Sequence, residues 1–334
     1  METAFFYQST SLNPYYNLAV ESVLSENVLT DWGGLYLWRN EKTVVIGRHQ
    51  NPYLECNLEN LQQDSIHLAR RMTGGGAVYH DAANLNFTFF NRRSDFDIKR
   101  NFNVILRALR QLGIEAQPDG RNDLCIQGKK FSGNAFFKNS DIAYHHGTLM
   151  LGVSLDNISK YLTPSAFKLK SKGVSSVKSR VINLNKIKES LTIDALSNML
   201  KQSYIEEFKI NIKALEEFDE LALNQRIKKF SSSLWIMGEN PDLLYKNSAH
   251  FTWGDIMIGL DYRKRIHVYS DALDTELISF VSNRLENEIN KLTNRELPLS
   301  SMAKFLNNPP QGLDSTQKQM WKDIQNLISE IKEP

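Results

Sequence analysis

Residues 70–81 read Arg-Arg-Met-Thr-Gly-Gly-Gly-Ala-Val-Tyr-His-Asp, with two arginines before three glycines that lead directly into a strand. Glycine lets the backbone adopt positive φ and approach a ligand closely, and successive exposed N–H groups form an anion-binding concavity. Arg71 can add bidentate recognition of a phosphate or carboxylate. A flexible glycine turn with surface arginines explains the bare glycine run equally well. The motif is neither a Walker loop nor a dinucleotide fingerprint, because Gly-x-x-x-x-Gly-Lys and Gly-x-Gly-x-x-Gly are absent.

Residues 128–135 read Gly-Lys-Lys-Phe-Ser-Gly-Asn-Ala and place a lysine pair on a strand beside a Ser-Gly step. A compact positive charge there could hold a carboxylate against an α-phosphate and offset charge in a transition state. A lysine pair on its own is more typical of solvated surface. Asp123 could orient such a lysine or hold a metal, although an isolated aspartate is more often a turn residue.

Residues 145–148, His-His-Gly-Thr, belong to a further expected strand. Adjacent strand residues face opposite sides of a sheet, so at most one of the two histidines enters a given site. No cysteine or carboxylate spacing completes a zinc site, and no Gly-x-Ser-x-Gly elbow indicates a serine hydrolase. Residues 170–180 are basic and rich in small side chains. This segment could fold over a nucleotide phosphate, although its composition favours an ordinary exposed loop.

The chain has 334 residues, of which 41% are hydrophobic and 23% are charged. This composition is typical of a globular protein, and the length suits two domains or one large domain with an appendage. The formal net charge of +2 gives no general signature of nucleic-acid binding. The two cysteines, Cys56 and Cys125, form no Cys-x-x-Cys pair, which fits a reducing compartment. Without a signal peptide or an apolar run of about 18 residues, we expect a cytoplasmic protein that does not enter a membrane.

Hydrophobic periodicity predicts an α+β protein with a largely antiparallel or mixed sheet. Expected helices cover residues 12–29, 101–112, 155–162, 192–208, 215–230, 274–293 and 314–331. Expected strands cover residues 34–39, 43–47, 76–80, 85–90, 122–137 and 145–153, with a second set within 250–270. The strands at 76–80 and 85–90 are expected to pair around the turn at 81–84. A turn-rich stretch at 238–241 predicts a domain boundary near residue 245, which divides the chain into 1–245 and 246–334.

The four chemical segments, in this order, resemble the lipoate–protein ligase family. Further stretches match the same family, namely Asn17–Glu21, Leu37–Asn40, Thr43–Arg48, Gln50–Pro52, Glu55–Asn57 and Gly120–Leu124. Phe251-Thr252-Trp253-Gly254 looks like the start of the family's small accessory domain, so the resemblance spans nearly the whole chain. It implies a catalytic domain of the biotin and lipoate ligase type, related to class II tRNA synthetases and built as a mixed sheet with helices. A small α+β C-terminal domain is expected to follow.

The resemblance implies a two-step reaction that uses ATP and Mg²⁺. Lipoate attacks the α-phosphate of ATP to give lipoyl-AMP and pyrophosphate, and an acceptor lysine then takes the lipoyl group as an amide. Magnesium would neutralise the triphosphate in the first step. The expected acceptor is a lipoyl domain of a 2-oxoacid dehydrogenase complex or a glycine-cleavage carrier protein. The enzyme is expected to be a monomer that binds no nucleic acid.

Residue by residue, Lys130 matches the family's essential lysine and is the predicted catalytic residue, in contact with both the lipoate carboxylate and the α-phosphate. The ATP-binding residues are predicted to be Arg71, Gly76, Ala77, Val78, Tyr79, Asp123, Lys130, Lys172 and Gly173. The lipoate-binding residues are predicted to be Gly74, Gly75, His80, Lys130, Ser132, Gly133 and His146. No direct metal motif is present, and Asp123 is the candidate magnesium ligand.

Two alternatives remain open. A cysteine-dependent octanoyl or lipoyl transferase of the same fold would need Cys56 or Cys125 as its nucleophile, and neither has a sequence context that lowers a thiol pKa. A non-catalytic lipoate or nucleotide binding module would not need Lys130 together with all the surrounding motifs. An apolar slot discriminates only weakly between lipoate and octanoate, so the preferred acyl group also stays open.

Overall fold

The computed structural model describes residues 2–27, 33–120, 122–163, 180–215, 218–239, 241–291 and 302–331. Its helices are α1 Pro14–Asn27, α2 Pro52–Glu55, α3 Leu58–Gln63, α4 Ile98–Gln111, α5 Leu155–Tyr161, α8 Ile193–Phe208, α9 Glu220–Ser231, α10 Ser233–Met237, α11 Thr275–Asn290 and α13 Ser315–Ser329. Its strands are β1 Thr3–Gln8, β2 Gly33–Trp38, β3 Thr43–Ile46, β4 His67–Arg70, β5 Val78–His80, β6 Asn84–Arg92, β7 Gln117–Asp119, β8 Asp123–Ile126, β9 Lys129–Lys138, β10 Ile142–Met150, β11 Asn211–Ala214, β12 Leu243–Phe251, β13 Gly254–Asp261 and β14 Ile266–Ser270. Among these helices, none has both the length and the apolar character that a membrane crossing requires.

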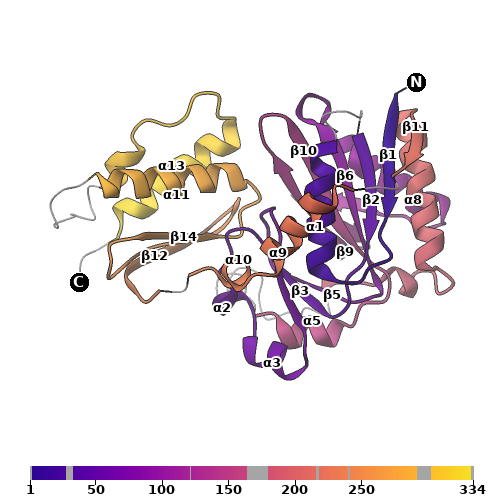
Figure 1. Cartoon of the computed structure of the whole chain (residues 1–334), viewed down its shortest axis with the longest axis horizontal. Helices are drawn as coiled ribbons and strands as arrows, with labels where there is room; N and C mark the ends of the chain where they lie inside the picture. The colour runs from indigo at the N-terminus through magenta and orange to yellow at the C-terminus, as the bar shows by residue number, and fades with distance from the viewer. Residues whose placement is uncertain are drawn as a thin grey trace.

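A mixed sheet forms the centre of the larger part of the molecule (Figure 1). Within the described ranges it has eight strands, in the order β11-β1-β2-β6-β10-β9-β8-β7. β1 pairs in parallel with both β11 and β2. The remaining neighbours pair antiparallel. The predicted α+β class and the mixed sheet are therefore confirmed.

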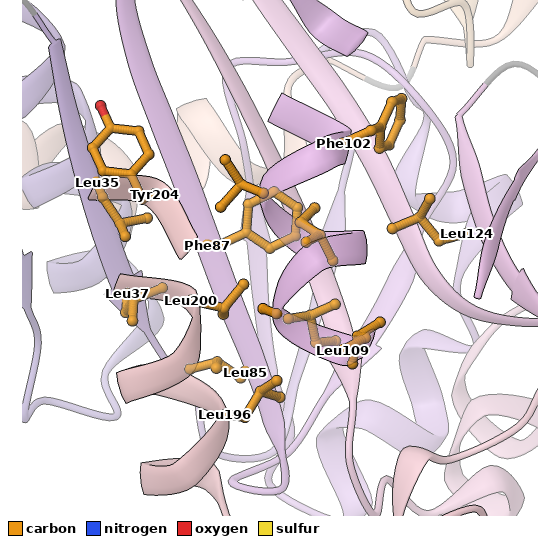
Figure 2. Close-up of a cluster of buried hydrophobic side chains, with 14 of the residues drawn as sticks. Leu35, Leu37, Leu85, Phe87, Phe102, Leu109, Leu124, Leu196, Leu200 and Tyr204 are labelled. Carbon is orange, nitrogen blue, oxygen red and sulfur yellow. The ribbon is translucent and has the colours of Figure 1, made fainter. Parts of the chain in front are cut away.

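The inner strands β2 and β6 are covered by helices on both faces. Leu35 and Phe87 pack on one face with residues of α4 and α8 (Figure 2). Tyr36 and Phe90 pack on the other face with residues of α1 and α9. Since successive strand side chains point to opposite faces, a strand between two helical layers has no face in contact with solvent. This double burial explains why both strands are buried along almost their whole length.

A smaller sheet, with the order β4-β3-β5, lies beside the main one. β3 pairs in parallel with β4 and antiparallel with β5. The predicted pairing of 76–80 with 85–90 is wrong, because β5 pairs with β3 whereas β6 joins the main sheet between β2 and β10. The turn at 81–84 therefore carries the chain from one sheet to the other. The local sequence around this turn does not encode that change, because the partner of β5 lies more than 30 residues earlier.

The expected strand at 122–137 is a hairpin of β8 and β9. Gln127 and Gly128 form its two-residue turn, with φ values of 50° and 74°. Positive φ at both central positions is the geometry that matches the right-handed twist of two paired strands. The hairpin pairs Cys125 with Lys130 and Asp123 with Gly133. It therefore brings Asp123 close to the predicted catalytic lysine.

The last part of the described chain forms a separate layered unit. β12, β13 and β14 make an antiparallel sheet, and α11 and α13 lie against it (Figure 1). Their buried residues form one hydrophobic cluster that extends from Trp253 to Ile331. We propose that this cluster is the core of a second domain. β12 begins at Leu243, beside the boundary predicted near residue 245.

Candidate active site

A cavity of about 330 Å³ lies between the main sheet, the glycine loop of residues 74–76 and the turn between β14 and α11. Its volume falls within the range of small-molecule sites. Apolar side chains such as Leu18, Trp38 and Val45 share the wall with charged and amide side chains. Such a mixture suits a ligand that has an apolar chain and a charged end.

The structure brings most of the predicted site residues to this cavity. The predicted residues in its wall are Arg71, Gly75, Gly76, Ala77, Val78, His80, Asp123, Lys130, Gly133 and His146. Gly74, Tyr79 and Ser132 do not belong to the wall: Tyr79 packs into a different hydrophobic cluster, and Ser132 is fully buried. Lys172 and Gly173 lie outside the described residues.

Alternation along β10 selects the side chains that face the cavity. His146 and Thr148 are two residues apart and both belong to the wall. His145 lies on the opposite face, where its ring centroid is 5.1 Å from that of Phe102 on α4. The prediction that at most one of the two histidines enters the site is therefore confirmed.

Lys130 extends from β9 along the cavity wall. Its Nζ lies 2.7 Å from Asp123 Oδ1. A Cβ at Gly133 would lie only 3.0 Å from the same Nζ, so glycine leaves the room in which the lysine lies. Both charged side chains are about one-third exposed. The ammonium is therefore ordered by one carboxylate yet remains accessible to a ligand.

Arg71 holds the glycine loop in place through hydrogen bonds to its carbonyl oxygens. Its Nη2 donates hydrogen bonds to the carbonyl oxygens of Gly74 (2.6 Å) and Gly76 (2.9 Å). Its Nη1 donates to Val45 O at 3.2 Å. Burial lowers the pKa of the guanidinium to about 10, and the charge of Glu21 opposes that change. Arg71 therefore uses several of its donors to hold the loop, in addition to facing the cavity.

The glycine loop is closely surrounded by other parts of the backbone, which leave little space for larger side chains. Gly75 has φ of +87°, in the left-handed region that disfavours other residues. Its carbonyl oxygen would lie 2.3 Å from a Cβ at Gly47, so the two backbones approach each other closely. On the other side, its N–H donates to Ala272 O at 3.2 Å, in the turn between β14 and α11. The loop therefore lies between the smaller sheet and the C-terminal unit.

His80 occupies the wall as a neutral side chain. Burial lowers the pKa of its imidazole to about 3, with further contributions from Arg71 and His146. Asn40 Nδ2 lies 3.2 Å from His80 Nδ1. Because an amide nitrogen only donates, Nδ1 accepts this bond and Nε2 carries the ring proton. His80 therefore adds no positive charge to the cavity at neutral pH.

Several wall residues were missed by the sequence analysis. Asn86 and Thr148 lie on predicted strands, and strand alternation relative to His146 could have pointed to Thr148. Asp271 and Leu273 come from the turn between β14 and α11. No local signal marks that turn, because its place in the site depends on how the C-terminal unit packs.

The described residues contain no group of three or more His, Cys, Asp or Glu side chains able to hold a metal ion. Mg²⁺ is usually bound by one or two carboxylates together with substrate phosphates. Asp123 and Asp271, both in the cavity wall, fit that pattern. The donor set is therefore compatible with a magnesium ion that arrives with a nucleotide.

Residues 13–205 match the lipoyl protein ligase A/B catalytic domain family. A lipoate–protein ligase A from Psychrobacter cryohalolentis is 38% identical over 292 residues, covering 83% of this chain and 86% of that protein. The crystal structure of P. falciparum LipL1 in complex with lipoate has a TM-score of 0.81 at 27% identity, and covers 98% of this chain and 99% of that one.

Two further solved structures cover a smaller share of the chain. Lipoate–protein ligase A bound with ATP has a TM-score of 0.63 at 28% identity, over 71% of this chain and 99% of its own. A bipartite lipoate protein ligase from Thermoplasma acidophilum, described with its E2 lipoyl domain, has a TM-score of 0.63 at 28% identity, over 73% of this chain and 98% of its own. With the predicted lysine and glycine loop in one cavity, these matches show that the chain is an enzyme of the lipoyl protein ligase A/B family.

Proposed function

We propose that this chain is an ATP-dependent lipoate–protein ligase. A carboxylate oxygen of lipoate attacks the α-phosphorus of ATP, the bond to the bridging oxygen of the β-phosphate breaks, and pyrophosphate leaves lipoyl-AMP behind. The amine of an acceptor lysine then attacks the acyl carbon, AMP leaves, and the amine loses a proton. The observation that carries this proposal is the accessible cation of Lys130 in the cavity that also contains the glycine loop.

Lys130 would allow two anions to meet. The lipoate carboxylate and the α-phosphate repel each other, and a point charge between them offsets that repulsion and stabilises the charge that develops in the transition state. Asp123 holds the ammonium at 2.7 Å without burying it. Mg²⁺ would neutralise the triphosphate, with Asp123 as one ligand. This reaction needs no protein nucleophile, because the adenylate is itself the activated acyl group.

The two cysteines support the ATP-dependent reaction over a thioester intermediate. Neither belongs to the cavity wall, and both are buried. Burial raises the pKa of the Cys56 thiol to about 12 and that of Cys125 to about 11. A thioester mechanism needs a thiolate that its substrate can reach. Both thiols are therefore poorly suited to act as the nucleophile.

We further propose lipoyl domains of 2-oxoacid dehydrogenase complexes as acceptors, with a glycine-cleavage carrier protein as a second candidate. The similar archaeal ligase described with an E2 lipoyl domain supports the first class. Mass spectrometry of purified carriers after incubation with the enzyme, ATP, Mg²⁺ and lipoate tests both classes. A mass increase of one lipoyl group on one lysine is expected, and a carrier that stays unmodified is excluded as an acceptor.

The first half-reaction is tested by ATP–pyrophosphate exchange. We expect exchange that requires lipoate and needs no carrier. A folded enzyme that catalyses no exchange would refute the proposed function. Transfer of an octanoyl or lipoyl group between carriers without ATP would instead support the cysteine-dependent alternative.

A further inference from the structure

Glu21 on α1 is a buried acidic residue, of which only 2% is exposed. Removing a carboxylate from water is costly unless hydrogen bonds replace its hydration. Glu21 Oε1 accepts a hydrogen bond from Thr88 Oγ1 at 2.6 Å and lies 2.8 Å from His146 Nδ1. Two central strands, β6 and β10, therefore supply the donors that hold this carboxylate.

The same bonds set the orientation of His146, which belongs to the cavity wall. A carboxylate only accepts, so His146 Nδ1 carries the proton of their shared bond. Its other nitrogen, Nε2, lies 2.8 Å from Thr73 Oγ1. Thr73 Oγ1 also accepts a hydrogen bond from Arg71 Nε at 3.0 Å. Glu21, His146, Thr73 and Arg71 form one continuous chain of hydrogen bonds, here called the Glu21 relay.

The Arg71 end of the relay controls peptide groups of the glycine loop. The guanidinium draws the carbonyl oxygens of Gly74 and Gly76 toward itself. A peptide unit is planar and trans, so the N–H groups of Gly75 and Ala77 must then point the opposite way. The Gly75 N–H is bonded there to Ala272 O at 3.2 Å, whereas Ala77 belongs to the cavity wall and its N–H can face a ligand. The direction in which the loop presents the Ala77 N–H therefore depends on where the guanidinium lies.

The charges of Glu21 and Arg71 also support a link between these two residues. Only 6% of Arg71 is exposed, and burial disfavours its charged form. The negative charge of Glu21 raises the pKa of that guanidinium against the effect of burial. Charges interact more strongly in the interior than in water, because the surroundings screen them less. Glu21 is therefore a buried counterion of Arg71, joined to it through His146 and Thr73.

We propose that Glu21 is a positioning residue of the ligase reaction, which acts through His146 and Thr73 to hold the Arg71 guanidinium and so to direct the Ala77 N–H of the glycine loop at an anionic group of the substrate. This inference rests on the proposed function, since it assigns that donor to a phosphate or carboxylate. Glu21 needs no contact with the substrate in this role. Its loss would misdirect a donor that is itself still present.

Matched substitutions at the two ends of the relay test this proposal. Thr73→Val removes the hydroxyl at nearly constant shape, whereas Thr73→Ser keeps it. Glu21→Leu removes the acceptor, whereas Glu21→Gln keeps an acceptor oxygen. For Thr73→Val and Glu21→Leu we expect kcat/KM for ATP in lipoate-dependent pyrophosphate exchange to decrease by about ten- to hundred-fold, the usual effect of unpairing a buried polar group. Thr73→Ser and Glu21→Gln should recover to within about five-fold of the wild type.

The double variant Glu21→Leu/Thr73→Val separates a relay from two independent effects. If the relay exists, the double variant loses no more activity than the worse single variant, because the second change breaks a chain that is already broken. Two losses that multiply would overturn the proposal, and so would wild-type activity of Thr73→Val. Should Glu21→Leu not fold, the Thr73 pair decides: equal activities of the valine and serine variants overturn the proposal, and a loss confined to valine supports it.

The exchange activity of the wild-type enzyme shows whether a failure concerns this proposal or the proposed function. If the folded wild type catalyses no lipoate-dependent exchange, the proposed function fails. The relay can then still be measured by the same double-mutant cycle in the free energy of unfolding. There, additive effects of Glu21→Leu and Thr73→Val would overturn the relay, and a clear coupling would support it.

Discussion

Gly75→Ala adds one methyl group where the glycine loop bends. Gly75 has φ of +87°, and such a left-handed conformation costs an L-residue about 1–2 kcal/mol. Alanine also reduces the entropy of the unfolded chain, which offsets about 0.4–1 kcal/mol of that cost. The free energy of unfolding should therefore fall by about 1 kcal/mol. In addition, the new Cβ would lie 3.0 Å from Arg71 Nη2, so the guanidinium must move by a few tenths of an ångström.

Gly113→Ala is the matched control. Gly113 has φ of +77°, and beyond the adjoining residues no heavy atom of the described chain lies within 4 Å of the position that its Cβ would take. Both variants should lose about 1 kcal/mol in urea denaturation. Only Gly75→Ala should lose activity, by about ten-fold in kcat/KM for pyrophosphate exchange, because small displacements of positioning groups are costly. Equal activity of the two variants would refute the idea that the geometry of this loop, rather than backbone strain, limits the reaction.

Lys130→Ala should reduce kcat for pyrophosphate exchange by about 100- to 1000-fold, since one preorganised charge is lost. Lys129→Ala, on the exposed neighbouring residue, should stay near the wild type; near-normal exchange by Lys130→Ala would contradict the assignment. The double variant Cys56→Ala/Cys125→Ala should keep full ligase activity, because both thiols stay protonated at neutral pH; a folded but inactive double variant would favour the thioester route. His80 has a folded pKa of about 3, below its unfolded value of about 6.5. The free energy of unfolding should therefore fall as the pH decreases from about 6.5 toward 3, by up to about 1.4 kcal/mol per pH unit. His80→Gln should flatten this dependence, and an unchanged slope would contradict the burial effect.

Local sequence signals predicted the helices better than the sheet. The helix expected at 192–208 is α8, Ile193–Phe208, and its Thr192 side chain caps the first turn by accepting a hydrogen bond from the N–H of Ala195. Periodicity and caps act within a few residues, so one sequence suffices to read them. β1 and β11 were missed. They pair in parallel across more than 200 residues of chain, as at Thr3 and Asn211, and no local pattern records that pairing.

The site residues divide in the same way, into those that a short segment reveals and those that only the packing brings to the cavity. Lys130 and the glycine loop were predicted because their chemistry is visible within short segments. The domain division and the individual binding roles stay predictions. Glu21 was not singled out, because its importance arises only when α1 packs against β6 and β10. Leu273 was missed for a similar reason, since it reaches the cavity through the packing of the C-terminal unit.

The cavity takes its wall from residues far apart along the chain, from Leu18 on α1 to Leu273 just before α11. Contacts between residues so distant in sequence require the closure of long loops, which makes them slow to form during folding. Refolding followed by ligand binding should therefore lag behind refolding followed by helical signal. A ligand that binds only the finished cavity also stabilises the folded state by mass action. Because the wall draws on the main sheet and on the turn between β14 and α11, one bound molecule should protect the larger part of the chain and the C-terminal unit from unfolding together.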